Sequence, residues 1–469
     1  MSSPAGVAKA VTMGERPAAE RVHDFSEVDT GFSPEEAIAE AERCLQCQKP
    51  SCIRGCPVEI DIPAFIASIS EGDFTGAARI IKENNLLPAV CGRVCPQEIQ
   101  CEGSCILGVK ETPVRIGELE RFVADHERGQ GLAAPPVAEP TGKQVAVVGS
   151  GPAGLTAAAE LARLGHAVTM FESLHEPGGV LVYGIPEFRL PKAVVRAEIA
   201  QLRAMGVTIR TNQLAGASVT VSDLLSYDAV FLGTGAGLPF FMGIPGEQLN
   251  GVYSANEFLT RVNLMHADRF PEFDTPVMHA GRVVVIGGGN VAMDSARVAR
   301  RLGARVTLVY RRREEDLPAR RAEVVRAKEE GVDLVLCANP VRILGDQAVT
   351  GVECFRMEMC DIDASGRPEP VPVEGSSFVI DADLCIQAIG QGPNPLLIRK
   401  LDGITYGRKG TILVDEEGKS SLERVYAAGD VATGAATVIL AMGGAKKAAR
   451  AIDRMLRGGE GEVNPVSTD

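Results

Sequence analysis

Residues 144–172, QVAVVGSGPAGLTAAAELARLGHAVTMFE, decide the fold of the central part of the chain. The run Gln144–Val148 is apolar and rich in β-branched residues, Gly151–Leu164 has helical periodicity, and Ala167–Phe171 is apolar again. A strand, a glycine turn, a helix and a second strand in this order predict a βαβ unit.

The glycines of this unit have the spacing of a nucleotide-binding turn. Gly149, Gly151 and Gly154 form a GxGxxG motif, and Glu172 closes the second strand. The first glycine permits the turn, the second lets a pyrophosphate approach the backbone, and the third lets the helix pack on the strand. The acid can accept a hydrogen bond from a ribose hydroxyl. GxGxxG alone could be a mere turn, but with strand, helix and acid in place it indicates a nucleotide site.

A second copy of the unit follows later in the chain. Its strand, helix and strand patterns occupy Arg282–Ile286, Val291–Leu302 and Arg305–Tyr310. The copies share register, because 149–172 and 287–310 both span 23 positions. Two nucleotide-binding folds are therefore predicted in one chain.

The second glycine turn is a GxGxxA variant whose unit ends in basic residues. Its candidate nucleotide contacts are Gly287, Gly289, Asn290 and Val291. Arg311, Arg312 and Arg313 stand where an NAD site would place an acid. Guanidinium groups pair with a 2′-phosphate that a carboxylate would repel, so Arg311 and Arg312 favour NADP(H) over NAD(H). The alternative is that the arginines are a solvated charge run.

Flanking segments indicate how the chain is organised. Helices are predicted at Ser33–Arg43, which has an N-cap Ser and a Glu three residues on, and at Gly117–His126; residues 1 to about 30 are polar and irregular. A Gly, Ala and Pro linker over Gly129–Lys143 places a domain boundary near residue 140. Because Arg424–Asp430 and a small-residue helix over Gly434–Ile452 come so late, we expect the first nucleotide domain to be interrupted by the second and completed after it.

Composition excludes several classes of protein. Asp and Glu number 61 against 48 Lys and Arg, a net charge of −13 that disfavours nucleic acid as a partner. The apolar stretches are interrupted before the ~18 residues that a membrane helix needs, so no membrane span is expected. Residues 1–20 have no apolar leader pattern, which predicts a cytoplasmic protein whose twelve cysteines are reduced.

Eight of these cysteines are grouped in the N-terminal part of the chain. They run Cys44-x2-Cys47-x4-Cys52-x3-Cys56-Pro57, then Cys91-x3-Cys95-Pro96, then Cys101-x3-Cys105. This is enough thiolate for two four-ligand centres. Zinc is the alternative, since Cys-x-x-Cys pairs also build zinc knuckles. Two Cys-Pro steps, the absence of histidine and the neighbouring nucleotide domains favour [4Fe-4S] clusters.

Two nucleotide sites beside such clusters predict FAD and a nicotinamide cofactor, because flavin can take a hydride and release single electrons. A dithiol reductase would need a cysteine pair near the flavin, and no Cys-x-x-Cys occurs beyond residue 105. No catalytic acid or base stands out among six histidines. The competing hypotheses are a flavin diaphorase with a zinc-stapled docking domain, and a scaffold that binds nucleotide without turnover.

The residues also carry a family resemblance. Over nearly its full length the chain resembles the small (beta) subunit of NADPH-dependent glutamate synthase and the related large subunit of NADH-dependent reduced ferredoxin:NADP oxidoreductase. The stretches that match are CLQCQKPSCIRGCPVEIDIP, VCGRVCPQEIQCEGSC, PVRIGELERF, GSGPAGL, GGVLVYGIPEFRLPK, GGGNVAMDSAR, YRRR, AIGQGPNP and YAAGDVATG.

The resemblance implies an α/β chain of the disulfide-oxidoreductase-like flavoprotein type, with two interleaved Rossmann-like nucleotide-binding domains. A helical N-terminal domain with two [4Fe-4S] clusters is expected over residues 1–140. The FAD-binding domain is expected over 141–250 and 386–469, and the inserted NADPH-binding domain over 251–385.

The resemblance also implies site residues. One cluster would be held by Cys44, Cys47, Cys52 and Cys105, and the other by Cys56, Cys95, Cys101 and Glu120. Cys91 would be spare, although whether it replaces Glu120 as a ligand stays open. FAD would lie against Glu172, Gly178, Gly179, Thr234, Gly235, Gly429 and Asp430.

The function implied is that of an NADPH-dependent oxidoreductase subunit. Electrons would pass between NADP(H), FAD and two [4Fe-4S] clusters, to or from a partner subunit. That partner would be the glutamate synthase large subunit or a small flavin and [2Fe-2S] subunit, with ferredoxin as a further partner. In the second setting the flow reverses, and electrons from a second flavoprotein divide between NADP and ferredoxin.

Overall fold

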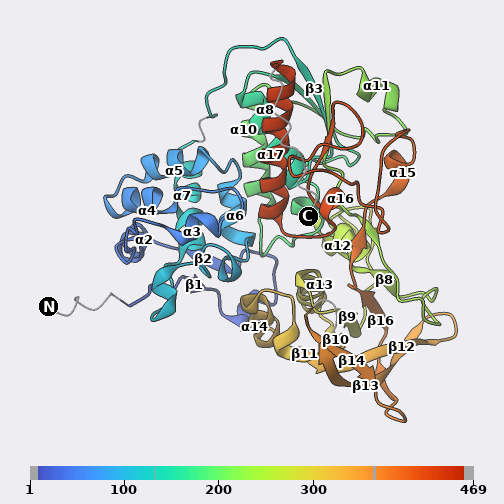
Figure 1. Ribbon diagram of the computed structural model, residues 1–469. Helices are drawn as coiled ribbons and strands as arrows, with labels where there is room; N and C mark the ends of the chain where they lie inside the picture. The colour runs from blue at the N-terminus through green and yellow to red at the C-terminus, as the bar shows by residue number, and fades with distance from the viewer. Residues whose placement is uncertain (1–8, 132–133, 363–365, 459–469) are drawn as a thin grey trace.

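Helices form most of the first part of the chain, and two parallel sheets follow (Figure 1). The computed structural model describes residues 9–131, 134–362 and 366–458. The N-terminal helices are α1 (Ala18–Arg21), α2 (Pro34–Ala41), α3 (Ser51–Arg54), α4 (Ile62–Ser70), α5 (Phe74–Lys82), α6 (Pro88–Val94) and α7 (Ile116–Gln130). The short elements beside them are β1 (Gly14–Glu15), β2 (Asp29–Gly31), η1 (Gln97–Ile99) and η2 (Ile106–Val109).

The sequence predicted two of these helices closely. Ser33 caps α2, its hydroxyl accepting from the Glu36 N–H while the Glu36 carboxylate accepts from the Ser33 N–H. The second predicted helix is longer than expected, because α7 extends to Gln130. The expectation that residues up to about 30 are irregular was wrong for β1, α1 and β2, and it holds for the residues between these short elements. Residues 1–8 lie outside the described part of the chain.

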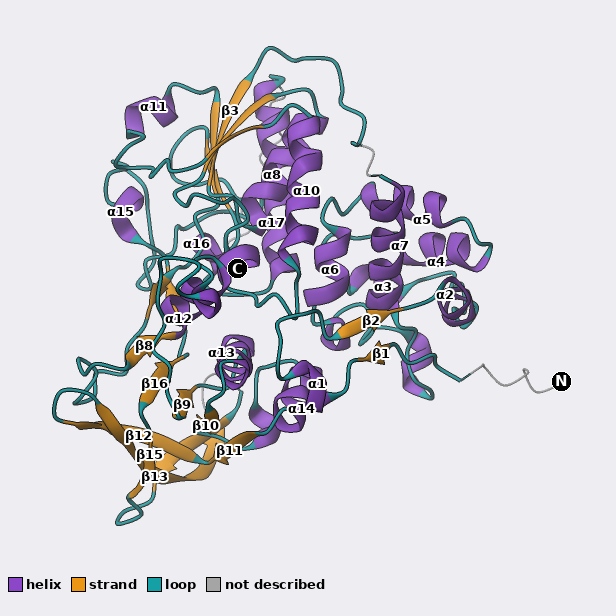
Figure 2. Cartoon of the chain, turned by 180° about the vertical axis from the view of Figure 1, so that it is seen from behind, coloured by secondary structure: helices purple, strands orange, loops and turns teal. Residues whose placement is uncertain are grey.

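The first parallel sheet has the order β18-β6-β3-β4-β5. Its strands are β3 (Gln144–Val148), β4 (Ala167–Phe171), β5 (Thr208–Arg210), β6 (Ala229–Leu232) and β18 (Val425–Ala427). The late strand β18 pairs with β6, so the first domain is indeed completed after the second. Three long helices, α8 (Pro152–Arg163), α10 (Lys192–Ala204) and α17 (Val438–Leu456), stand together beside this sheet (Figure 2).

The second parallel sheet has the order β11-β10-β9-β16-β8. Its strands are β8 (Val252–Ser254), β9 (Arg282–Ile286), β10 (Arg305–Tyr310), β11 (Val332–Leu336) and β16 (Leu384–Gln387). The helices of this domain are α12 (Ala255–Asn263), α13 (Asn290–Arg301) and α14 (Arg321–Glu329), with η3 (Ala267–Arg269) and η4 (Glu314–Asp316). The boundary predicted between residues 385 and 386 falls inside β16, whose pairing with β8 and β9 extends the second sheet to Gln387.

An antiparallel sheet that the sequence reasoning did not foresee lies between β11 and β16. It consists of β12 (Ala338–Gly345), β13 (Val349–Ile362), β14 (Pro368–Pro372) and β15 (Phe378–Asp381), with β13 pairing with the other three. The remaining elements are β7 (Leu238–Pro239), β17 (Gln391–Gly392), α9 (Val180–Tyr183), α11 (Val221–Leu225), α15 (Pro395–Ile398) and α16 (Asp430–Thr433). In the described part of the chain, no helix has the length and apolar character needed to cross a bilayer.

The helical part packs against α17 of the first nucleotide domain. Gly443 permits this contact, because a Cβ at this position would lie 2.6 Å from the Pro57 carbonyl oxygen. One turn along α17, the Lys446 Nζ donates to the carbonyl oxygens of Val58, at 3.1 Å, and Asn84, at 3.0 Å. These contacts bring the cysteine-bearing loops beside the first nucleotide domain.

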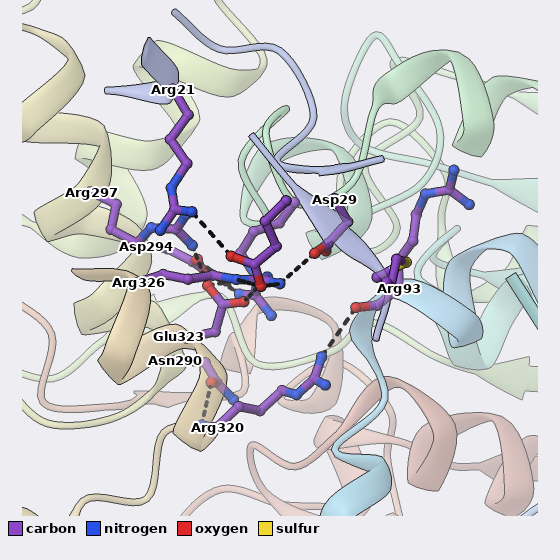
Figure 3. Close-up of polar contacts among 12 residues, drawn as sticks. Arg21, Asp29, Arg93, Asn290, Asp294, Arg297, Arg320, Glu323 and Arg326 are labelled. Atoms are coloured by element: carbon purple, nitrogen blue, oxygen red, sulfur yellow. Dashed lines mark hydrogen bonds and ion pairs between the residues drawn. The ribbon is translucent and has the colours of Figure 1, made fainter. Parts of the chain in front are cut away.

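A network of buried ion pairs joins the N-terminal segment to the second nucleotide domain (Figure 3). Arg21 donates from Nε to Glu330 at 2.9 Å and from Nη2 to Glu329 at 2.7 Å. The Glu330 carboxylate also accepts from Arg297, and from Arg301 at 2.7 Å. A buried charge is tolerated only when its partners are present, so this network holds the two parts in one arrangement.

The Glu330→Ala variant tests this network. It leaves three buried guanidinium groups without their shared carboxylate, and removal of one partner from a buried ion pair costs about 3–5 kcal/mol. We therefore expect a clearly lower midpoint of thermal unfolding. The matched control is Arg305→Ala, whose exposed pair with Asp333 should contribute little. Equal midpoints for the two variants would contradict the structural role of Glu330.

Candidate functional site

One cavity of about 1550 Å³ lies between the two nucleotide domains. Residues of both glycine loops line it, as do residues of the C-terminal return. The predicted site residues in its wall are Gly149, Gly151, Glu172, Gly179, Thr234, Gly235, Gly287, Gly289, Asn290, Val291, Arg311, Arg312, Gly429 and Asp430. Gly154 and Gly178 are not among the residues that line it.

Each glycine of the first loop has a separate physical reason to lack a side chain. Gly149 has φ +94°, and a Cβ on it would lie 2.4 Å from the Gly233 carbonyl oxygen. A Cβ on Gly154 would lie 1.9 Å from the Gly149 carbonyl oxygen, which would separate α8 from β3. A Cβ on Gly151 would meet no atom within 4 Å. Gly151 therefore faces open space in the cavity, where a pyrophosphate can approach the backbone.

Glu172 is held at the end of β4 by hydrogen bonds to its carboxylate. Its Oε2 accepts from the Ser150 backbone N–H at 3.0 Å and from the Ser150 hydroxyl at 2.5 Å, and its Oε1 accepts from the Leu174 N–H at 2.8 Å. Gly178 donates its N–H to the same Ser150 hydroxyl at 2.9 Å, so it supports the loop. Ser150 is a site residue that the motif reading missed.

The second glycine loop repeats this geometry. Gly287 has φ +140°, and a Cβ on it would lie 2.4 Å from the Ala388 carbonyl oxygen, whereas a Cβ on Gly289 would meet nothing within 4 Å. No side chain caps the N-terminus of α13 or of α8, so the first-turn N–H groups of both helices are free to face a ligand in the cavity. Such helix N-termini favour phosphate groups.

The arginines after β10 differ in their placement. Arg311 is exposed and lines the cavity. Arg312 also lines it, but only 2% of the residue is exposed and its Nε donates to the Pro368 carbonyl oxygen at 2.8 Å. Arg313 lies outside the cavity wall, with its Nη1 3.8 Å from a Glu315 carboxylate oxygen. Of these three arginines, Arg311 is thus the exposed one in the cavity wall.

The sequence reasoning also missed a buried ion pair in the cavity wall. Arg189, from the first nucleotide domain, donates from Nη1 to both carboxylate oxygens of Asp294, at 2.8 and 2.7 Å. Asp294 lies on α13 four residues after Asn290, hence on the same helix face. That spacing could have indicated Asp294, but its partner is 105 residues away in the chain. The pair joins the two nucleotide domains across the cavity.

The structure brings one predicted cysteine quartet together. Cys44, Cys47, Cys52 and Cys105 line a small hollow of about 30 Å³, whose wall is otherwise mainly apolar, and we call them the distal thiols. Burial, with smaller contributions from Cys105 and Cys44, raises the pKa of Cys52 to about 11. A bound cation would be needed to keep the Cys52 thiol ionised at neutral pH.

A second set of thiols surrounds Glu120, and we call Cys56, Cys95 and Cys101 the proximal thiols. Burial chiefly, with the Glu120 carboxylate in addition, raises the pKa of Cys56 to about 11. Burial also raises the pKa of Glu120 to about 8, against a hydrogen bond that its Oε1 accepts from Asn85 at 2.7 Å. The Cys91 thiol, which is not one of the proximal thiols, lies near Cys95 and Glu120 and is 3.5 Å from the Met442 sulfur of α17.

The proximal thiols lie beside the nucleotide cavity. Val94 and Pro96, the two neighbours of Cys95, line that cavity. The Arg320 side chain donates to the Arg93 carbonyl oxygen at 3.1 Å and to Gln97 at 2.8 Å, and its backbone N–H donates to Asn290 at 3.0 Å (Figure 3). The second glycine loop and the Cys95 segment are therefore connected through one arginine.

Within the described residues, no group of three or more His, Cys, Asp or Glu side chains is close enough to hold a single metal ion. All twelve cysteines are free thiols. The distal thiols thus line one hollow without converging on a single point. The proximal thiols are buried close enough to Glu120 for its carboxylate to raise their pKa values.

Two family models match the chain. Residues 21–132 match the dihydropyrimidine dehydrogenase domain II, 4Fe-4S cluster family. Residues 143–453 match the pyridine nucleotide-disulphide oxidoreductase family, which covers more than half of the chain.

Similar proteins span nearly the whole chain. The glutamate synthase [NADPH] small chain of Halomonas elongata is 38% identical over 91% of this chain and 92% of its own length. The NADP(+)-dependent formate dehydrogenase subunit beta of Moorella thermoacetica is 39% identical over 89% of this chain and 61% of its own length. Among solved structures, FprA of Mycobacterium tuberculosis in complex with NADPH has a TM-score of 0.56 at 22% identity, over 71% of this chain and 88% of its own, which establishes the shared fold.

Two of the three glycines of the first loop, Gly154 and Gly151, should respond differently to substitution by alanine. In Gly154→Ala the new Cβ must displace α8 from β3, and overpacking of this kind costs about 1–3 kcal/mol or more, so we expect a lower unfolding midpoint. In Gly151→Ala the Cβ enters open space, so we expect a normal apoprotein midpoint but less bound flavin per chain. Thermal unfolding and flavin absorbance measure the two effects. Full flavin content in Gly151→Ala would contradict the assignment of this loop.

Proposed function

Since this chain belongs to the pyridine nucleotide-disulphide oxidoreductases and to the family of the glutamate synthase small chain, we propose that it carries electrons between NADP(H) and a partner subunit through FAD and two [4Fe-4S] clusters. The observation that carries this function is the single cavity that both glycine loops line, together with the neighbours of a proximal thiol. An NADP(H) site, a flavin site and a cluster site would then adjoin one another.

The residues present fit these groups. When bound, FAD takes a hydride from NADPH and releases electrons singly, and iron–sulfur clusters carry single electrons. Gly151 and the free N–H groups of α8 would hold the FAD pyrophosphate, and Glu172 would accept from its ribose. Gly179, Thr234, Gly235, Gly429 and Asp430 would complete the flavin site, as their place in the wall allows.

The second loop would hold NADP(H) in the corresponding way. Gly289, Asn290 and Val291 lie at the N-terminus of α13, where a pyrophosphate binds, and Arg311 would pair with the 2′-phosphate. Arg312 would contribute charge from behind, because its Nε is already hydrogen-bonded. The Arg189–Asp294 pair would hold the two domains in register across the bound nucleotides.

The thiols would hold the clusters. The distal cluster would have the ligands Cys44, Cys47, Cys52 and Cys105, which share one hollow. The proximal cluster would have Cys56, Cys95, Cys101 and Glu120, whose carboxylate lies among these thiols. A donor set without histidine and a match to a 4Fe-4S family support iron–sulfur clusters over the zinc alternative.

The proposed function includes a partner subunit and a cellular location. The relatives are named a small chain and a beta subunit, which supports a partner subunit for this chain. We assign that role to a glutamate synthase large subunit or to a small flavin and [2Fe-2S] subunit, with ferredoxin as a further partner. Twelve unpaired cysteines support a reducing, cytoplasmic setting.

Nucleotide preference tests the second site. Arg311→Glu replaces attraction to the 2′-phosphate by repulsion, so we expect the KM for NADPH to rise about tenfold or more and the KM for NADH to change far less. Steady-state dye reduction with both nucleotides measures this. Arg313→Glu, outside the cavity wall, is the matched control and should change neither KM. Equal losses for both nucleotides in Arg311→Glu would remove the basis for an NADP(H) preference.

An anaerobic titration tests the function as a whole. Addition of NADPH to the purified chain should bleach the flavin bands and then the broad absorption of the clusters. A flavin that NADPH does not bleach would overturn the proposal, and so would protein that contains zinc but neither iron nor acid-labile sulfide.

Iron and sulfide contents of two single-cysteine variants test which thiols hold the clusters. Cys52→Ser should lower iron and sulfide by about half, because one of two clusters loses a ligand. Cys91→Ala should leave both unchanged, since Cys91 is the spare thiol. Loss of iron in Cys91→Ala would instead make Cys91 a ligand in place of Glu120.

A further inference from the structure

Gln387 lines the nucleotide cavity, and its side-chain amide is buried there without a hydrogen-bond partner. Gln387 is 2% exposed, and neither its Nε2 nor its Oε1 has a partner. Among the described residues, the other buried side-chain atoms without a partner belong to residues outside this wall. An unpaired buried amide is costly, so this one indicates a ligand that pairs with it.

The position of Gln387 on the second sheet indicates which part of a dinucleotide it would meet. Gln387 ends β16 and is in register with Ile286, which ends β9; Ile286 is in turn in register with Val309 of β10. The three parallel strands therefore end at one edge of the sheet, about 4.8 Å apart. The chain continues from β9 to β10 on one side of β9, while β16 lies on the other, so a switch in strand order falls between β9 and β16.

A dinucleotide laid along this edge has a defined direction. Arg311, which follows β10, would take the 2′-phosphate of the adenosine half, and the loop after β9 would take the pyrophosphate. The next strand is β16, so the nicotinamide half would lie over Gln387. Gly287 contacts the Ala388 carbonyl oxygen closely enough to exclude a Cβ, so the pyrophosphate loop and the end of β16 are immediate neighbours.

Three other polar side chains of this part of the wall each have a partner within the protein. The Asn256 Nδ2 donates to the Gly237 carbonyl oxygen at 2.6 Å. The Asn290 Oδ1 accepts from the Arg320 N–H, and Asp294 is paired with Arg189. Gln387 is left with one donor group and one acceptor side by side.

We propose that Gln387 binds the carboxamide of the nicotinamide ring and so orients the ring toward the flavin site. This inference rests on the proposed function, because it takes NADP(H) as the ligand of the second glycine loop. A carboxamide offers the N–H and the carbonyl oxygen that a second amide requires. The terminal torsion of a glutamine is broad, so the amide can turn toward the cavity when the ring arrives.

The experiment compares ligands with and without the nicotinamide group. Oxidised holoenzyme is titrated by calorimetry with NADP⁺, with 2′-phospho-ADP-ribose, which lacks the base, and with the nicotinic acid analogue of NADP⁺, in which a carboxylate replaces the carboxamide. The variant is Gln387→Leu, which removes both hydrogen-bonding groups and keeps the approximate size. Gln347→Leu makes the same change at a turn outside the cavity wall and is the matched control.

The expected result is selective. Gln387→Leu should weaken NADP⁺ binding about tenfold, the loss of one or two hydrogen bonds, and leave 2′-phospho-ADP-ribose unchanged. The wild type should bind NADP⁺ more tightly than its nicotinic acid analogue, and Gln387→Leu should lose most of that difference. Gln347→Leu should behave as the wild type with all three ligands.

Other outcomes would overturn the assignment. Equal weakening of NADP⁺ and 2′-phospho-ADP-ribose in Gln387→Leu would make Gln387 a structural residue, and an unchanged NADP⁺ affinity would remove it from the site. Arg311→Glu should weaken both ligands together, because both carry the 2′-phosphate. If wild-type holoenzyme bound neither ligand, the proposed function itself would fail and the Gln387 assignment with it.

Discussion

The structure depends on the close approach of backbone to backbone at the two glycine loops. At Gly149, Gly154 and Gly287 a side chain would clash with a neighbouring carbonyl oxygen. At Gly151 and Gly289 it would extend into the cavity. In the first kind, Gly154 lets α8 pack on β3, while Gly149 and Gly287 let each loop approach the end of a neighbouring strand. The second kind leaves the helix N-terminus open to a phosphate. Because both loops open into the same cavity, two nucleotides can meet there.

The helical N-terminal part is held to this scaffold by two different kinds of contact. On one side, α17 has no side chain at Gly443, so the helical part can approach the backbone of α17 closely. Lys446 of the same helix donates to two carbonyl oxygens of the helical part. On the other side, the ion pairs of Arg21 with Glu329 and Glu330 attach α1 to the second nucleotide domain. Buried charges of this kind add specificity to an arrangement, since each needs its partner in place. The proximal thiols are thereby held beside the cavity and the distal thiols farther along the helical part.

Local sequence patterns predicted those helices and strands that depend on residues close together in the chain. The two βαβ units, the capping box of α2 and the late return of β18 and α17 could all be read from residues close together in the chain. The antiparallel sheet formed by β12 to β15 was not foreseen, because its alternation follows directly on a parallel strand with no glycine motif to mark the change. Arg189 and Asp294 were missed for another reason: each reads as an ordinary charged residue until the fold places them together.

The amino-acid sequence by itself determined the two nucleotide-binding units, the excess of thiols in the first part of the chain and the basic end of the second unit, because each depends on residue types at short fixed spacings. Only the tertiary structure decided which thiols share a hollow, that the neighbours of Cys95 reach the nucleotide cavity, and that Gln387 stands unpaired in its wall. These features depend on contacts between segments far apart in the chain, where burial and pairing are properties of the packed molecule and of no single stretch of it.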